Sequence, residues 1–333
     1  MALLSITRDP MLRLLSLAIV LAAFLPAMGP ARSAAQTVAN AAIFVLFLLN
    51  GLRIERRDIL AGMADWRFLL PLVAWVFGAM ALAGLVLARL GQAELPALVA
   101  LGFLYLGALP STVQSAASYT SLAGGRVALS VVSAALLNVL GVFVTVPIFL
   151  ALGGSGEGAV GSEAIMKILI MLVLPLALGL LLQYRARSFT ARHRHRIVWI
   201  DRWVIAIAVY VAFSGAVEQG IWTLIDWSGW IIVIGLVAIF LAIGHFGAWL
   251  AGGALGLPMA DRIAFLFAGA QKSAAVGAPL AAILFPPAAA GFIVVPLLLY
   301  HLLQLVVAAP LSSRLARLHP PGDDGYSAPT TRS

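Results

Sequence analysis

The chain has 333 residues, of which 62% are hydrophobic and 10% charged, and its net charge is +8. A soluble domain carries about 25% charged residues, so this composition excludes a soluble protein and indicates one that spans a membrane. The sequence contains no cysteine, which excludes disulfide bonds and thiolate metal sites.

Ten apolar stretches of low charge follow one another along the chain, and each is a predicted membrane-spanning helix. A helix needs about 20 residues to cross the hydrocarbon layer, and most of the stretches reach that length. The second and seventh are short, so we expect flanking arginines such as Arg53 and Arg202 to reach the interface. The stretches cover residues 14–29, 37–52, 68–88, 95–120, 127–152, 168–184, 203–217, 228–256, 263–285 and 287–312.

The two ends of the chain carry further expectations. A cleavable signal peptide is the alternative interpretation of the first stretch, because Arg8 and Arg13 precede it and small residues follow it near Ala34. Removing it would leave an odd number of spans, so we favour a membrane span. Residues 320–333 are polar and contain Gly, Pro and Ser, which predicts a disordered cytoplasmic tail after a single transmembrane domain over 1–319.

Basic residues are distributed unevenly between the two sets of predicted loops. One set holds 17 of the 21 Lys and Arg residues, and the other holds only Arg32, Arg89 and Lys167, while Lys272 lies inside a span. Loops rich in Lys and Arg stay in the cytoplasm, so both termini are predicted to be cytoplasmic. The positive net charge thus reflects topology, not nucleic-acid binding, and the chain is expected to be a multi-pass protein of a bacterial inner membrane.

Landmarks of the first half recur in the second half at a nearly constant offset. Asn50 closes the second stretch and Ser214 closes the seventh, 164 positions later, while Asn138 and His301 each precede a proline by nine residues. Because five spans per half is an odd number, a second copy at about 164–316 would be inverted relative to a first copy at about 10–152. Inverted repeats are frequent in secondary transporters, and chance similarity among apolar helices is the alternative.

Polar side chains gather in the fourth stretch directly after Pro110. Proline removes a backbone N–H and frees a carbonyl, which lipid tolerates only where protein groups or a water-filled cavity satisfy it. A proline kink packed by small residues is the alternative explanation. The polar residues concerned are Ser111, Thr112, Gln114 and Ser115.

The ninth stretch contains Gln271, Lys272 and Ser273 in succession, followed by Pro279. A lysine at the centre of the bilayer costs about 2.5–3.5 kcal/mol on insertion scales, so it needs partners or a function. We predict helix breaks at Pro110 and Pro279, with these two polar clusters forming a substrate or ion site. Asn50, Asn138 and His301 are predicted supporting polar groups, and a structural lysine bonded to helix-end carbonyls is the alternative for Lys272.

Acidic side chains and enzyme motifs are missing from the predicted spans. All 13 Asp and Glu residues lie outside the apolar cores, so no carboxylate there can relay protons or neutralise a bound cation. The chain has no H-E-x-x-H, G-x-S-x-G or Walker motif. His245 and His301 are isolated, and helix–helix hydrogen bonding explains them better than catalysis. We therefore expect a protein that is not an enzyme and has no cofactor.

At these residues the sequence resembles the bile acid:sodium symporter superfamily, and in particular a bacterial subgroup related to the seventh member of human solute carrier family 10. The resemblance reaches both halves of the chain. It is carried by residues 47–53 (FLLNGLR), 109–115 (LPSTVQS), 271–279 (QKSAAVGAP) and 295–301 (VPLLLYH).

The resemblance implies a fold of ten helices in two inverted five-helix repeats, with the fourth and ninth helices discontinuous and crossing. It also implies that helices 3–5 and 8–10 form a core that moves against a panel of helices 1, 2, 6 and 7. In sodium-coupled members a glutamate shortly precedes a Gln-Asn pair in the ninth helix. Here residues 265–272 read FLFAGAQK, so the glutamate position is apolar and Lys272 replaces the asparagine.

The expected function is secondary transport of a small organic anion by alternating access. The possible coupling ion is Na⁺ or H⁺, and Lys272 would replace the bound cation as a fixed charge or a proton carrier. The alternative is a non-transporting membrane regulator that keeps the fold and binds a partner or anionic lipid at the basic segment 185–202. The substrate and the oligomeric state are not specified by the sequence.

Overall fold

The computed structural model describes residues 10–53, 65–153 and 166–319, and within these ranges every regular element is helical. The first half contains α2 (Pro10–Phe24), α3 (Gly29–Arg53), α5 (Trp66–Val73), the π-helical segment η1 (Ala74–Ala79), α6 (Met80–Gly91), α7 (Ala97–Ala108), α8 (Val113–Leu122) and α9 (Val127–Ala151). The second half contains η2 (Leu169–Val173), α11 (Leu174–Arg192), α12 (Arg194–Glu218), α13 (Ile221–Leu224), α14 (Trp227–Ala242), η3 (Ile243–Gly247), α15 (Ala248–Ala254), α16 (Met259–Ala270), α17 (Ala274–Leu284) and α18 (Pro287–Leu318). The predicted tail at 320–333 lies outside the described residues.

Eight helical stretches among the described residues are long and apolar enough to cross a membrane. The bent pair α7 and α8 makes a ninth if it is counted as one span, and α2 is a shorter apolar helix of 15 residues. An all-helical protein with multiple membrane spans is therefore confirmed. Ten spans in two inverted repeats remain a prediction.

Several predicted boundaries were wrong. The second and seventh spans are not short, because α3 and α12 each have 25 residues, and the first helix ends at Phe24 instead of residue 29. The basic segment 185–202 was expected to be a loop, but α11 continues to Arg192 and α12 begins at Arg194. Arginine is a good helix former, so a charged segment can extend an apolar helix beyond the hydrocarbon layer.

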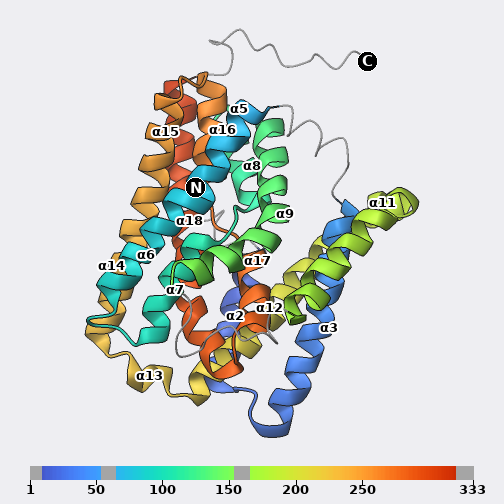
Figure 1. Ribbon diagram of the computed structural model, residues 1–333, viewed down its shortest axis with the longest axis vertical. Coiled ribbons are helices and arrows are strands. Elements are labelled where there is room, and N and C mark those ends of the chain that lie inside the picture. Colours follow the sequence, from blue (N-terminus) through green and yellow to red (C-terminus); the bar gives the residue numbers. More distant parts are fainter. Residues whose placement is uncertain (1–9, 54–64, 154–165, 320–333) are drawn as a thin grey trace.

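The helices pack in two groups (Figure 1). One group, here called the panel, comprises α2, α3, α11 and α12, which contact one another. The other group, here called the core, contains α5 to α9 and α14 to α18. The panel touches the core mainly where α12 packs against α17 and α18. This grouping agrees with the panel and core that the family resemblance implied.

Inside the panel, α3 and α11 approach each other unusually closely. A Cβ atom added to Gly51 would lie 2.3 Å from the Leu176 carbonyl oxygen, and one added to Gly179 would lie 2.3 Å from the Leu48 carbonyl oxygen. Small residues at helix interfaces let two backbones make extensive van der Waals contact in lipid. The α3–α11 pair is therefore built as one unit, which Figure 1 shows inclined away from the core.

Two core spans are interrupted. Between α7 and α8 the chain is non-helical at residues 109–112, and the two halves are bent by 62°. Between α16 and α17 it is non-helical at residues 271–273. The predicted break at Pro110 is thus confirmed.

The predicted break at Pro279 was wrong, because Pro279 lies inside α17. Proline removes only one backbone N–H, and the surrounding residues of α17 are buried against neighbouring helices, so the helix continues through it. The ninth span instead opens at Gln271–Ser273, where another chain segment supplies hydrogen-bond partners to the backbone.

Candidate functional site

The two interruptions meet through hydrogen bonds between their polar groups. The Ser273 N–H donates to the Pro110 carbonyl oxygen at 3.0 Å, and the Thr112 hydroxyl donates to the Lys272 carbonyl oxygen at 2.8 Å. One turn further along α8, the Ser115 hydroxyl donates to Oε1 of Gln271 at 2.9 Å. We call this contact between residues 109–115 and 271–273 the crossover. It brings the predicted polar clusters of the fourth and ninth spans together.

Lys272 is fully buried at the crossover, with an exposed fraction of 0%. Its ammonium donates to the carbonyl oxygens of Gly107 and Leu109 at 2.8 Å each, and to that of Val76 at 3.2 Å. An ammonium has three donors and no acceptor, so these three bonds satisfy it. In this arrangement the lysine holds helix ends together, which is the contact that its structural alternative predicts.

The position of Lys272 has an electrostatic reason. Gly107 and Leu109 lie at the C-terminal end of α7, where the last carbonyls have no partners within the helix and the helix dipole is negative. Val76 belongs to η1, whose π-helical hydrogen-bond pattern differs from the α-helical pattern of the flanking helices. The side-chain nitrogen of Lys272 therefore sits in a cage of three backbone carbonyls.

Gln304 of α18 is a site residue that the sequence-based prediction missed. Its side chain is completely buried, its Oε1 accepts from the Lys272 N–H at 2.8 Å, and its Nε2 donates to the Lys272 carbonyl oxygen at 3.1 Å. Nε2 also lies 2.9 Å from Nδ1 of His301, so this histidine supports the crossover through Gln304. The available signal was a glutamine three residues after His301 in an otherwise apolar span.

Two buried polar atoms at the crossover have no hydrogen-bond partner. They are the Ser111 hydroxyl oxygen and Nε2 of Gln271, and both residues have an exposed fraction of 0%. Buried polar groups are normally paired, and exceptions point to water, an ion or a ligand. The crossover thus retains one hydroxyl and one amide group that other protein groups do not satisfy.

Three predicted residues lie apart from these hydrogen bonds. Gln114 is exposed on α8, on the same face as Ser118 and Ser121. Asn138, on α9, donates to the Ala134 carbonyl oxygen. Asn50 accepts from Arg53 near the end of α3.

Comparison with known proteins agrees with this geometry. A model of the SBF-like CPA transporter family matches residues 9–317. An uncharacterized protein of Pseudomonas aeruginosa is 37% identical over 90% of each chain, and a protein of Escherichia coli K12 named "Putative symporter YfeH" is 36% identical over 93% of each chain. Mouse sodium/bile acid cotransporter 7 is 23% identical over 83% of this chain and 82% of its own. The predicted resemblance is confirmed: the chain belongs to the SBF-like CPA transporter family.

Proposed function

We propose that this protein is a secondary active transporter of a small organic anion, which works by alternating access around the crossover. The observation that carries the proposal is the contact of two interrupted helices through buried polar groups, two of which remain unpaired. Transporters build substrate and ion sites from such discontinuous helices near the bilayer midplane. The names of the relatives, a symporter and a sodium/bile acid cotransporter, support the same class of function.

The charge at the crossover favours an anionic substrate. Among the described residues, Lys272 is the only Lys, Arg, Asp or Glu residue that is buried. Every Asp and Glu residue in this part of the chain is at least partly exposed. The N-terminus of α8 also points its unpaired backbone N–H groups toward the break, and its N-cap Thr112 makes no side-chain capping bond. Both features attract negative charge.

A polar face of α8 provides a path to this region. Gln114, Ser118 and Ser121 follow one another at helical spacing and are exposed, within a span whose other faces are packed. Polar side chains at this depth are unfavourable against lipid and favour a water-filled cavity. We place the substrate path along this face, between core and panel, with Gln114 at its inner end.

Coupling is proposed to be independent of sodium. A cation bound at the carbonyl cage would meet the Lys272 ammonium, and like charges repel strongly where the dielectric constant is low. The lysine would then replace the ion, because its side-chain nitrogen occupies the carbonyl cage.

The ten-helix inverted repeat is part of the same proposal. The helix α2 would serve as the first span, and η1 and η3 would lie inside the corresponding third and eighth spans. A matching π-helical segment in each half supports an origin from two equivalent units. Movement of the panel against the core would then expose the crossover to the two sides alternately.

Uptake into proteoliposomes tests the function. Organic anions that raise the melting temperature of the purified protein are offered with sodium or with choline as the cation. We expect uptake that is equal in both salts and falls at least about tenfold in Gln114→Ala, because a hydrogen-bonding contact along the path is lost. The control Thr223→Ala, at an exposed position of α13, should transport normally. If the folded protein transports none of the anions that raise its melting temperature, this result would favour the alternative of a non-transporting regulator.

Topology provides a separate prediction. We expect the ends bearing Arg126, Arg262 and Arg317 to be cytoplasmic, because basic loops resist translocation. A reporter fused after Arg317 should therefore be active on the cytoplasmic side, and one inserted in residues 153–161 on the opposite side. Activity of both reporters on one side would contradict the ten-span arrangement.

A further inference from the structure

The junction of α11 and α12 concentrates positive charge on a helical hairpin outside the crossover. Within this segment Asp201 pairs with Arg53 of α3 at 2.6 Å and also interacts electrostatically with Arg202. The arginines of the segment are Arg185, Arg187, Arg192, Arg194, Arg196 and Arg202. Loop topology explains positive charge at this end of the helices, but it does not explain a shaped pocket.

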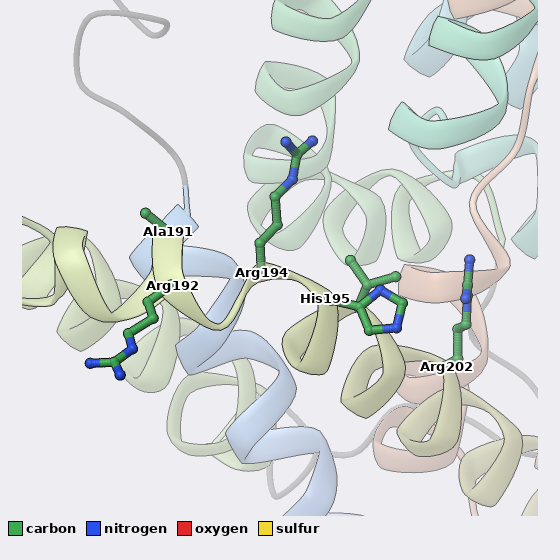
Figure 2. Close-up of a pocket in the computed structure, with 6 residues that line it drawn as sticks. Ala191, Arg192, Arg194, His195 and Arg202 are labelled. Carbon is green, nitrogen blue, oxygen red and sulfur yellow. The ribbon is translucent and has the colours of Figure 1, made fainter.

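An open pocket of about 490 Å³ lies at this junction (Figure 2). Figure 2 shows Arg192 and Arg194 on either side of the turn between the helices, and His195 and Arg202 further along α12. Its lining is basic and contains no acidic side chain. The lining residues are Ala191, Arg192, Arg194, His195, Val198 and Arg202.

Two side chains of the pocket are held in place. The Arg202 guanidinium lies over the Trp199 ring, 5.1 Å from its centre, and its Nε is buried without a hydrogen-bond partner. Nε1 of Trp199 donates to Nε2 of His195 at 3.1 Å, and this hydrogen bond orients the imidazole ring. Arginine is suited to binding phosphate because its planar fork presents several donors at once. The pocket lining therefore offers guanidinium donors of the kind that bind a phosphate group.

A second, apolar groove of about 200 Å³ lies further along α12. It is lined by Leu14, Leu17 and Leu21 of α2 and by Trp203, Ile207 and Tyr210 of α12, among others. Ile207 lies nine residues beyond Val198, which corresponds to about 13 Å along a helix. The headgroup layer of a bilayer is only about 5–8 Å thick on each side, so a groove at that depth faces hydrocarbon.

We propose that α12 carries a binding site for an anionic phospholipid. The phosphate lies in the basic pocket with Arg194, His195 and Arg202, and an acyl chain lies in the groove between α2 and α12. Charge complementarity selects the headgroup, and the apolar groove selects a ligand that carries a hydrocarbon chain. The exposed Trp203 and Tyr184 place this region at the membrane interface, where such residues are enriched.

Native mass spectrometry of the full-length protein in detergent tests the proposal, with phosphatidylglycerol and phosphatidylcholine of identical acyl chains as probes. We expect phosphatidylglycerol to bind at least about tenfold more tightly. Arg194→Gln combined with Arg202→Gln should weaken phosphatidylglycerol binding at least about tenfold. Arg185→Gln combined with Arg187→Gln removes equal charge outside the pocket and should change binding less than about twofold.

The groove has its own test. Ile207→Trp fills it and should weaken phosphatidylglycerol binding, whereas Ile231→Trp at an exposed position of α14 should not. If the double variant at 194 and 202 unfolds, single Arg194→Gln at an exposed position serves instead. Three results would overturn the proposal: equal loss in both double variants, no preference for phosphatidylglycerol, or displacement of the lipid by inorganic phosphate at equal concentration.

Discussion

Replacing Lys272 by alanine is expected to lower both the melting temperature and the transport rate, the latter by at least about tenfold. The substitution removes the donor that three buried carbonyl oxygens share, those of Val76, Gly107 and Leu109. Each buried acceptor left without a donor costs about 1–3 kcal/mol. The C-terminal end of α7 would also lose the positive charge that balances its dipole. Thermal unfolding and proteoliposome uptake measure the two effects.

Chemical rescue distinguishes a replaceable cation from a packing role. Lys272→Ala removes three carbons and the ammonium, which together correspond to n-propylammonium. This amine, present from solubilisation onward, should restore stability to Lys272→Ala. Lys272→Met removes the same charge, but its side chain fills the space that the lysine side chain occupied. The amine should therefore not restore the stability of Lys272→Met. Sodium chloride should also stabilise Lys272→Ala more than choline chloride does, because the emptied carbonyl cage offers oxygen ligands to a small cation.

The outcomes separate the possible roles of the lysine. Full transport and stability in Lys272→Met would show that the charge is dispensable. Sodium-dependent uptake by the unmodified protein would contradict the proposal that Lys272 replaces the ion. Normal stability in Lys272→Ala combined with lost transport would mean that the lysine acts on the substrate and not on the helix ends.

Replacing Gly215 by valine is expected to prevent the panel and core from closing at one end of the protein. A Cβ atom at Gly215 of α12 would lie 2.1 Å from the Pro287 carbonyl oxygen of α18. On the opposite side of the same contact, a Cβ atom at Gly291 would lie 2.3 Å from the Ala212 carbonyl oxygen. Backbone atoms cannot yield as flexible side chains do, so the observed contact cannot form with valine there. Transport should fall at least about tenfold, because alternating access requires each end to close.

Cysteine labelling measures this change directly, because the natural chain has no cysteine. Ala216 is completely buried at the same contact, so Ala216→Cys should resist a membrane-impermeant maleimide and become reactive in the Gly215→Val background. Gly235→Val is the matched control, since a Cβ atom there meets nothing within 4 Å. Labelling and transport that remain unchanged in Gly215→Val would show that this contact does not take part in the cycle.

The sequence by itself determined the class of the protein and the location of its unusual residues. Apolar runs, the interruption after Pro110 and the buried position of Lys272 can be recognised because they depend on residues that are neighbours in the chain. Residues 109–115 and 271–279 likewise indicated the family. The local composition of a span is sufficient for these conclusions, since lipid imposes the same requirements on every helix.

Only the tertiary structure decided how the buried polar groups are satisfied. Lys272 finds its acceptors 163 to 196 positions away, and Gln304 holds the Lys272 backbone from another span. These partners depend on how helices pack, which no local pattern specifies. The same reason explains the error at Pro279: a proline predicts a break locally, but the helix opened at Gln271–Ser273, where distant segments supplied the missing hydrogen bonds.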